Sequence, residues 1–287
     1  MTFQSFDMAI EWSKNMLLTK GKDVDAGSWQ GYQTQGKPDL VTKEILNLQL
    51  EVPVYQRTDW VGEKGVHGEE LDVLQHQIQP NLPWADDHFL ERVSRQPTNP
   101  GVEYKNWPWW HGQEATAMVV EPHYIEGLFT HTYQERFWPK SAGFVPSMDD
   151  KTSPNWGIRY EFGDLDDVVS LLFENPYTRQ ATFPIFFPED TGSVHGGRTP
   201  CTLHYHFMLR EDKLHMWYAI RSCDLVRHFR DDLYLACRLL LWVLEELFER
   251  ELRSDTPQLW VDVNPGTLFF TAYSFHVHHG DLHHVKS

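Results

Sequence analysis

The sequence predicts a mixed α+β protein with one domain across residues 1–287, and three observations support this. The chain is long enough to bury one substantial core, and 41% of its residues are hydrophobic. Residues 231–252 place apolar side chains at three- and four-residue spacings, which is typical of a long helix. The segments 179–187, 202–209 and 213–221 are rich in β-branched and aromatic residues, which is typical of strands. We therefore expect a mixed β-sheet packed with helices.

Weaker patterns predict the remaining elements. Residues 164–174 begin with an acidic turn, which the helix dipole favours, so we expect a helix there. Residues 259–263 and 267–278 are expected to be two more strands, separated by an Asn-Pro-Gly turn. Residues 43–55 favour a strand or a short helix. No motif assigns a role to the N-terminal residues 1–50.

Composition limits the function classes. The formal net charge is −16, which disfavours nucleic-acid binding because an acidic surface repels phosphates. No apolar run approaches the ~18 residues that a membrane span needs, and the N-terminus lacks the basic and apolar segments of a secretion signal. Cys201, Cys223 and Cys237 have neither metal-site nor disulfide-framework spacing. We therefore expect a cytoplasmic protein without a nucleic-acid or membrane partner.

The arginines that stand out occur singly rather than in runs. They are Arg57, Arg179, Arg198 and Arg221. Separate guanidinium groups that converge on one small ligand suit a phosphate monoester better than a polyanion. The alternative for each arginine is a solvated surface charge.

Cys201 is the candidate nucleophile. It follows Pro200 and opens a predicted strand, where a thiol can be exposed and held in position. A cysteine attacks as the thiolate, which a nearby cation stabilises, and Arg221 lies in an Arg-Ser-x-Asp motif twenty residues on. The alternative is that Cys201 is a small buried apolar residue.

Two further segments accompany this cysteine. The run Phe-Arg-Asp-Asp ends at Asp232, at the start of the long predicted helix. His276 and His278 alternate with apolar residues on a predicted strand, so both point to one face. Histidines on one face can bind zinc, but no further ligands are evident, and we expect no metal.

In their order along the chain, these motifs resemble the thymidylate synthase superfamily, over roughly residues 55–284. The motifs are Arg57-Thr58, a tryptophan cluster, Asn175-Pro176 to Arg179, Pro200-Cys201, Arg221-Ser222-x-Asp224, a long helix, and a strand that contains His276. The resemblance implies the thymidylate synthase fold and a homodimer that forms sheet to sheet.

The details look most like the deoxycytidylate 5-hydroxymethylases. The nucleophile is followed by Thr202 rather than histidine, and Asp232 stands where thymidylate synthases carry an asparagine that recognises uracil. The chain ends at Ser287, so we expect no folate-closing tail. These features imply hydroxymethylation, in which Cys201 adds to carbon 6, carbon 5 takes the methylene of 5,10-methylenetetrahydrofolate, and water completes the product.

Asp232 carries the expected base preference. A carboxylate accepts a hydrogen bond from the 4-amino group of cytosine, whereas an amide complements the N3 hydrogen and 4-carbonyl of uracil. We therefore expect a cytidylate substrate. The alternative is that Asp231 or Asp232 only caps the helix.

The resemblance also implies the other ligand contacts. The phosphate is expected among Arg57, Arg221, Ser222 and a partner subunit's copy of Arg179, and Gln180 replaces a second arginine of the family. Arg198 is a candidate to compensate for that arginine.

The sugar hydroxyls are expected at His276 and His278, although the family pattern has tyrosine at the second position. This departure leaves ribose and deoxyribose both open.

The folate is expected to stack on Trp107, Trp109 and Trp110 and to bond Asp224 through its pterin. Packing in the core or in an interface is the alternative for the tryptophans. Glu91, on an expected helix Phe-Leu-Glu-Arg-Val, is the candidate general acid or base, with Asp87 second.

Three other functions stay open at this point. One is CMP 5-hydroxymethylation that begins a nucleoside antibiotic. Another is a thymidylate synthase-like reaction on dUMP. The last is a family member that binds a nucleotide without catalysis.

Overall fold

The computed structural model describes residues 1–29, 32–54, 68–99, 101–109, 124–125, 128–129, 131–142, 163–191, 199–254 and 259–286. Arg57, Trp110 and Arg198 lie outside these residues, so their expected roles stay predictions.

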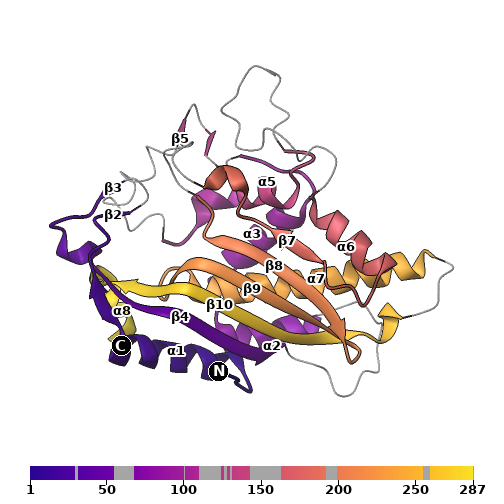
Figure 1. Cartoon of the computed structure of the whole chain (residues 1–287), viewed down its shortest axis with the longest axis horizontal. Coiled ribbons are helices and arrows are strands. Elements are labelled where there is room, and N and C mark those ends of the chain that lie inside the picture. Colours follow the sequence, from indigo (N-terminus) through magenta and orange to yellow (C-terminus); the bar gives the residue numbers. More distant parts are fainter. Residues whose placement is uncertain are drawn as a thin grey trace.

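A six-stranded mixed sheet runs through the described structure (Figure 1). Its order is β1-β4-β10-β9-β8-β7, in which β9 and β10 are parallel and the other neighbours are antiparallel. A parallel pair needs a crossover, which helix α7 supplies between β9 and β10. The strands are β1 (Lys22–Val24), β4 (Thr42–Pro53), β7 (Thr182–Pro184), β8 (Thr202–Arg210), β9 (Lys213–Asp224) and β10 (Asn264–His278). Two short hairpins add β2 (Ser28–Trp29) with β3 (Tyr32–Gln33) and β5 (Tyr124–Ile125) with β6 (Leu128–Phe129).

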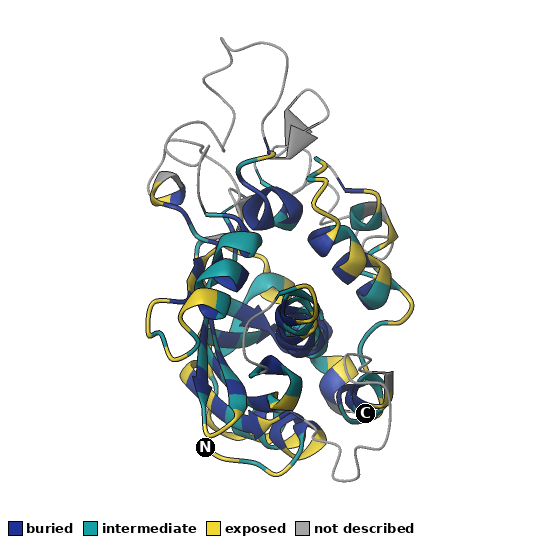
Figure 2. Cartoon of the chain, turned by 90° about the vertical axis from the view of Figure 1, so that its right-hand side faces the viewer, coloured by how far each residue is buried: buried dark blue, intermediate teal, exposed yellow. Residues whose placement is uncertain are grey.

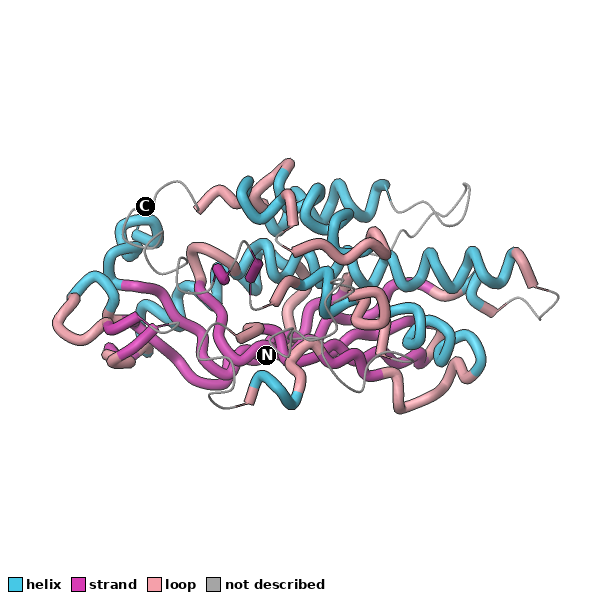
Figure 3. The backbone as a smooth tube through the Cα atoms, turned by 90° about the horizontal axis from the view of Figure 1, so that it is seen from above, coloured by secondary structure: helices cyan, strands magenta, loops and turns pink. Residues whose placement is uncertain are grey.

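Most helices lie on one side of the sheet (Figure 3). They are α1 (Phe6–Lys20), α2 (Gly68–Ile78), α3 (Trp84–Val93), α5 (Tyr133–Phe137), α6 (Leu165–Glu174), α7 (Phe229–Leu252) and α8 (Leu282–Lys286). Figure 2 looks along α7 and shows it dark at the centre of the molecule. Leu233, Ala236, Leu240 and Leu247 of this helix are fully buried. The mixed sheet, the helix expected at 164–174 and the long helix are therefore confirmed. No helix of the described residues combines the length and apolarity of a membrane span.

The N-terminal segment belongs to the same hydrophobic core as the rest. Phe6 and Leu17 of α1 are fully buried, and Leu50 of β4 is 1% exposed. Strand β4 pairs with β10 along eleven residue pairs, so residues 1–50 contribute a strand between β1 and β10. The expected strand or short helix at 43–55 is a strand.

Two sequence predictions about strands need correction. The strand expected at 179–187 is limited to β7, Thr182–Pro184. The strand expected at 259–263 is wrong, because Trp260–Asp262 forms a 3₁₀ helix. The carboxylate of Glu251 accepts the backbone N–H groups of Trp260 and Val261, both at 2.9 Å. Those donors are therefore not available to a neighbouring strand.

We predict that Glu251→Ala destabilises the fold by about 3 kcal/mol, because it leaves several backbone donors without their charged acceptor. Glu251 is 5% exposed, whereas the side chain of Glu249, two residues earlier, is 44% exposed and pairs with the exposed Arg253. Urea unfolding should separate Glu251→Ala from Glu249→Ala, which should change stability by less than about 0.5 kcal/mol. Equal effects of the two variants would contradict this assignment.

Candidate active site

Cys201 lies at the start of β8, where Arg221 holds the preceding turn. The Arg221 side chain donates to the carbonyl oxygens of Thr199 and Pro200, both at 2.9 Å. Its Nη2 lies 3.8 Å from Sγ of the half-buried Cys201. The same guanidinium therefore fixes the turn and places a positive charge beside the thiol, which is the arrangement that stabilises a thiolate.

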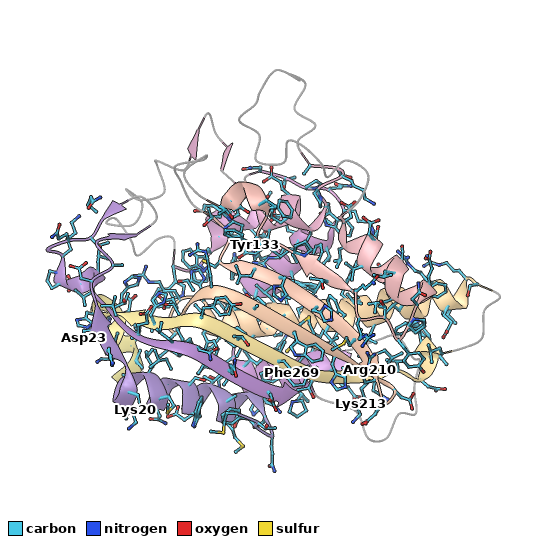
Figure 4. All side chains as sticks on the ribbon, viewed as in Figure 1. Lys20, Asp23, Tyr133, Arg210, Lys213 and Phe269 are labelled. Atoms are coloured by element: carbon cyan, nitrogen blue, oxygen red, sulfur yellow. The ribbon has the colours of Figure 1, made fainter. Side chains whose placement is uncertain are left out.

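A cluster of hydroxyl groups lies next to the nucleophile. Tyr133 Oη is 3.1 Å from Thr202 Oγ1, and Thr202 Oγ1 is 3.1 Å from Tyr218 Oη. Figure 4 labels Tyr133 at α5, beside the end of the sheet where β8 begins. Burial raises the pKa of Tyr133, and the adjacent Cys201 raises it further, so the phenol keeps its proton. Tyr133 thus contacts Thr202, the residue that follows Cys201.

Asp232, in the first turn of α7, contacts Cys223, which lies two residues after Arg221 on β9. Cys223 Sγ lies 3.7 Å from Asp232 Oδ2. Burial raises the pKa of Asp232 to about 7. Its neighbour Asp231 instead accepts the backbone N–H of Asn81 at 2.8 Å and its side-chain amide at 2.7 Å. The N-cap position of α7 is His228, and its side chain makes no capping bond. Asp232 lies inside the first turn and not at the N-cap position.

Asp224, His276 and His278 form a second polar group at the ends of β9 and β10. Asp224 is paired in register with His276, and His278 Nε2 lies 3.9 Å from Asp224 Oδ2. Burial alone would raise the pKa of Asp224, but His276, His228 and His278 lower it below its usual value, so the group is ionised. The carboxylate can therefore accept hydrogen bonds from a ligand.

The same three residues are a possible set of metal ligands, with one ligand atom each within 4.8 Å of the others. Arg227 Nε stands 4.0 Å from Asp224 Oδ2, and this positive charge disfavours a bound cation. Asp224 Oδ1 already accepts the backbone N–H groups of Val226 and Arg227 at 2.8 and 3.0 Å. The arrangement suits hydroxyl and amide recognition better than metal binding.

The two described tryptophans of the expected folate site pack against histidines. Trp107 stacks on His228 with ring centroids 4.8 Å apart, and Trp109 meets His284 edge-on at 5.4 Å. Both indole N–H groups are buried without an acceptor among the described residues. A flat ligand that carries carbonyl or carboxylate oxygens would supply those acceptors, so these residues fit a folate.

Glu91, the expected general acid or base, supports a loop. Its carboxylate accepts the backbone N–H groups of Val102 and Glu103 and lies 3.6 Å from His88 Nδ1. Gly101 leaves room for it, since a Cβ there would lie 2.5 Å from Glu91 Oε2. Burial opposes ionisation of Glu91, but His88 and the Val102 N–H outweigh it and lower the Glu91 pKa.

The residue that α3 places against Tyr133 is Arg92, which sequence analysis missed. Its guanidinium carbon lies 4.1 Å from the centre of the Tyr133 ring, and the residue is only 7% exposed. A signal existed in the sequence, because Arg92 falls at a buried position of the α3 pattern with Ala85, Phe89 and Val93. A charged residue at such a position indicates a special role.

The expected phosphate ligands differ in their burial. Ser222 is half-buried on β9, in register with Ser274 and directly after Arg221. Arg179 is exposed in the segment between α6 and β7. Asp87, the second acid/base candidate, is exposed on α3.

Comparisons with known proteins bear on the fold. No protein-family model matches the chain. A curated putative thymidylate synthase from Methanosarcina mazei is 27% identical over 133 residues, which cover 46% of this chain and 53% of that protein. The match thus spans about half the length of that relative. The solved structure of thermostable thymidylate synthase A from Bacillus subtilis matches with a TM-score of 0.58 and 14% identity, over 99% of this chain and 83% of that chain. The chain therefore has the thymidylate synthase fold, and it is related in sequence to a thymidylate synthase-like protein.

Proposed function

We propose that this chain transfers a one-carbon unit to carbon 5 of a pyrimidine nucleotide, and that the nucleotide is a cytidylate that becomes 5-hydroxymethylated. The observation that carries the proposal is the arrangement around Cys201. A half-buried thiol lies 3.8 Å from an arginine, and a carboxyl group with a raised pKa is contributed by the next helix, α7. A nucleophile with a cation beside it and a base-recognition residue are what addition to carbon 6 requires.

The chain's own residues divide the chemistry among them. Cys201 adds to carbon 6 of the ring, while Arg221 stabilises the thiolate beforehand and offers its remaining N–H groups to the phosphate. Tyr133 and Thr202 orient the strand start through their 3.1 Å contact. 5,10-Methylenetetrahydrofolate supplies the carbon when bound, and Trp107, Trp109 and Asp224 are the described residues proposed to hold it. Glu91 remains the sequence candidate for proton transfer.

Asp232 supports the choice of cytosine. An ionised carboxylate accepts from the 4-amino group, and uracil has no donor at that position. The pKa near 7 also supports a second candidate, because a protonated Asp232 offers one donor and one acceptor, as an amide does. Uridylate is therefore the alternative substrate, favoured where Asp232 is protonated.

We propose that His276 and His278 face the sugar hydroxyls, with dCMP preferred and CMP the alternative. We also propose a homodimer in which each Arg179 reaches the partner's phosphate site.

An aromatic patch supports the dimer. His206, Trp217 and Phe269 are half-buried on neighbouring strands, and the Trp217 and Phe269 rings stack at 4.4 Å. Figure 4 labels Phe269 on β10, in the part of the sheet where the strands lie in front of the helices.

Tritium release from carbon 5 tests the reaction. With methylenetetrahydrofolate present, we expect release from labelled dCMP, less from CMP and little from dUMP at pH 8, and none with Cys201→Ala. Asp232→Asn should reverse the preference towards dUMP, because the amide complements uracil. Release from dUMP alone by the unaltered protein would exclude cytidylate, and release from no substrate would favour a non-catalytic binding protein.

The pH dependence should differ between the two bases. Because burial raises the pKa of Asp232 to about 7, its carboxylate forms only as the pH rises through that value. We expect kcat/KM for cytidylate to increase through pH 7 and that for uridylate to decrease. In Asp232→Asn the step near pH 7 should disappear for both substrates. A step that persists in this variant would have to be assigned to another group.

Sedimentation equilibrium tests the dimer. Trp217→Glu places a charge in the aromatic patch and should shift the protein towards monomer. The control is Leu252→Glu, since Leu252 is 57% exposed at the far end of α7. A monomeric unaltered protein, or a Trp217→Glu variant that stays dimeric, would remove this part of the proposal.

A further inference from the structure

Arg92 is a buried cation to which the proposed reaction assigns no role. It lies on the inner side of α3 and is 7% exposed. Its guanidinium lies flat against Tyr133, whose hydroxyl contacts Thr202, the residue after the nucleophile. The positive charge also counteracts the effect of burial on Asp232. Arg92 therefore lies one side chain away from the strand start that follows Cys201, and its charge also acts on Asp232.

No carboxylate of the described residues lies within salt-bridge distance of this guanidinium. Its Nε donates to His88 Nε2 at 3.0 Å, and no other hydrogen bond from it to a described residue occurs. By contrast, Arg136 is also buried but donates to both oxygens of Asp190 at 2.9 Å. An arginine that is buried without a carboxylate is costly unless some other negative charge comes to it.

A chain of contacts fixes the orientation of this cation. Burial, and then the Arg92 charge, lower the pKa of His88 to about 4, so the ring is neutral and its Nε2 accepts from Arg92. The other nitrogen, Nδ1, faces Glu91 Oε2 at 3.6 Å, and Trp84 stacks on the ring at 4.9 Å. Glu91 thus contacts His88, which in turn contacts Arg92, and Glu91 acts on Arg92 through this histidine.

We propose that Arg92 is a further catalytic residue, which stabilises the negative charge that develops on the pyrimidine ring as Cys201 adds to carbon 6, and that Glu91 is a positioning residue for it through His88. This inference rests on the proposed function. A preorganised, buried cation favours the charged adduct over the neutral bound base.

The electron balance of the addition shows why a cation is needed. The thiolate forms the S–C6 bond, and the C5=C6 π pair moves towards carbon 4. In cytosine the pair comes to rest on N3 and the 2-carbonyl oxygen, and in uracil on the 4-oxygen. The negative charge thus passes from sulfur, which lies beside Arg221, to the ring. Arg92 is the second cation, placed for that later position.

The test measures the rate of covalent adduct formation with 5-fluoro-dCMP and 5-fluoro-dUMP in the presence of methylenetetrahydrofolate, by rapid quenching and intact-protein mass spectrometry. Equilibrium binding of the unmodified nucleotides is measured in parallel. For Arg92→Met we expect adduct formation to slow by about 10²–10³-fold, as for loss of one oxyanion donor. Nucleotide affinity should change by no more than roughly threefold, since the contact strengthens only in the adduct.

Three further variants make the result specific. Arg92→Lys keeps the charge and should recover part of the rate, which a purely structural role would not predict. Glu91→Gln should slow the adduct step less than Arg92→Met does, whereas a direct proton-transfer role would leave that step unchanged. Arg95→Met is the matched control, because Arg95 pairs with Asp166 and Glu246 at the surface and should leave the rate unchanged.

The outcomes separate the two proposals. An unaltered protein that forms no adduct with either analogue overturns the proposed function and this inference with it. Adduct formation at the same rate in Arg92→Met overturns the role of Arg92 alone. If Arg92→Met does not fold, as judged by circular dichroism, then Arg92→Lys decides, and an unchanged rate together with unchanged affinity in that variant overturns the inference.

Discussion

The parallel pairing of β9 with β10 is the constraint on which the candidate site depends. Because the strands are parallel, the ends of β9 and β10 lie together, and Asp224 faces His276 in register. Because β8 is antiparallel to β9, the start of β8 lies at that same end, which brings Cys201 next to Arg221. The crossover helix α7 must begin there as well, and it carries Asp232 in its first turn. Residues far apart in sequence therefore meet through topology alone.

Several carboxylates of this protein accept backbone N–H groups, and Asp232 differs from them. Glu251, Glu91 and Asp224 each accept at least two backbone N–H groups, and Asp231 accepts one together with the Asn81 side chain. These bonds hold the loops to which the backbone donors belong. No hydrogen bond from a backbone N–H to the Asp232 side chain occurs among the described residues, and burial raises the pKa of this carboxyl group to about 7. A carboxyl group kept in this state is available to a ligand.

Much of this could be predicted from the sequence, and the failures have physical causes. The spacing of apolar residues identified α7. An acidic first turn identified α6, and β-branched and aromatic residues identified β8 and β9. The strand expected at 259–263 failed because a side chain, Glu251, took the backbone donors from a distance in sequence. The N-terminal strand β4 received no role, since its place beside β10 is set by pairing that sequence does not show.

For the site, short motifs indicated Cys201, Arg221, Asp224 and His276, and the structure brings these four to one end of the sheet. The same approach chose Glu91 and overlooked Arg92, the next residue. On a helix, neighbouring residues point about 100° apart, so a choice between them depends on the helix orientation. The burial of Ala85, Phe89 and Val93 with Arg92 fixes that orientation.

In the proposed reaction Arg92 and Arg221 have to bind negative charge within a strongly acidic protein. A net charge of −16 repels both a nucleotide phosphate and a folate carboxylate. At physiological ionic strength, exposed charges are screened beyond about 8 Å, so distant acidic residues count for little within the pocket. Arg92 and Arg221 are buried or half-buried and are screened much less. Two cations in a site of low dielectric can thus hold a thiolate and then an anionic ring, although the molecule as a whole is strongly acidic.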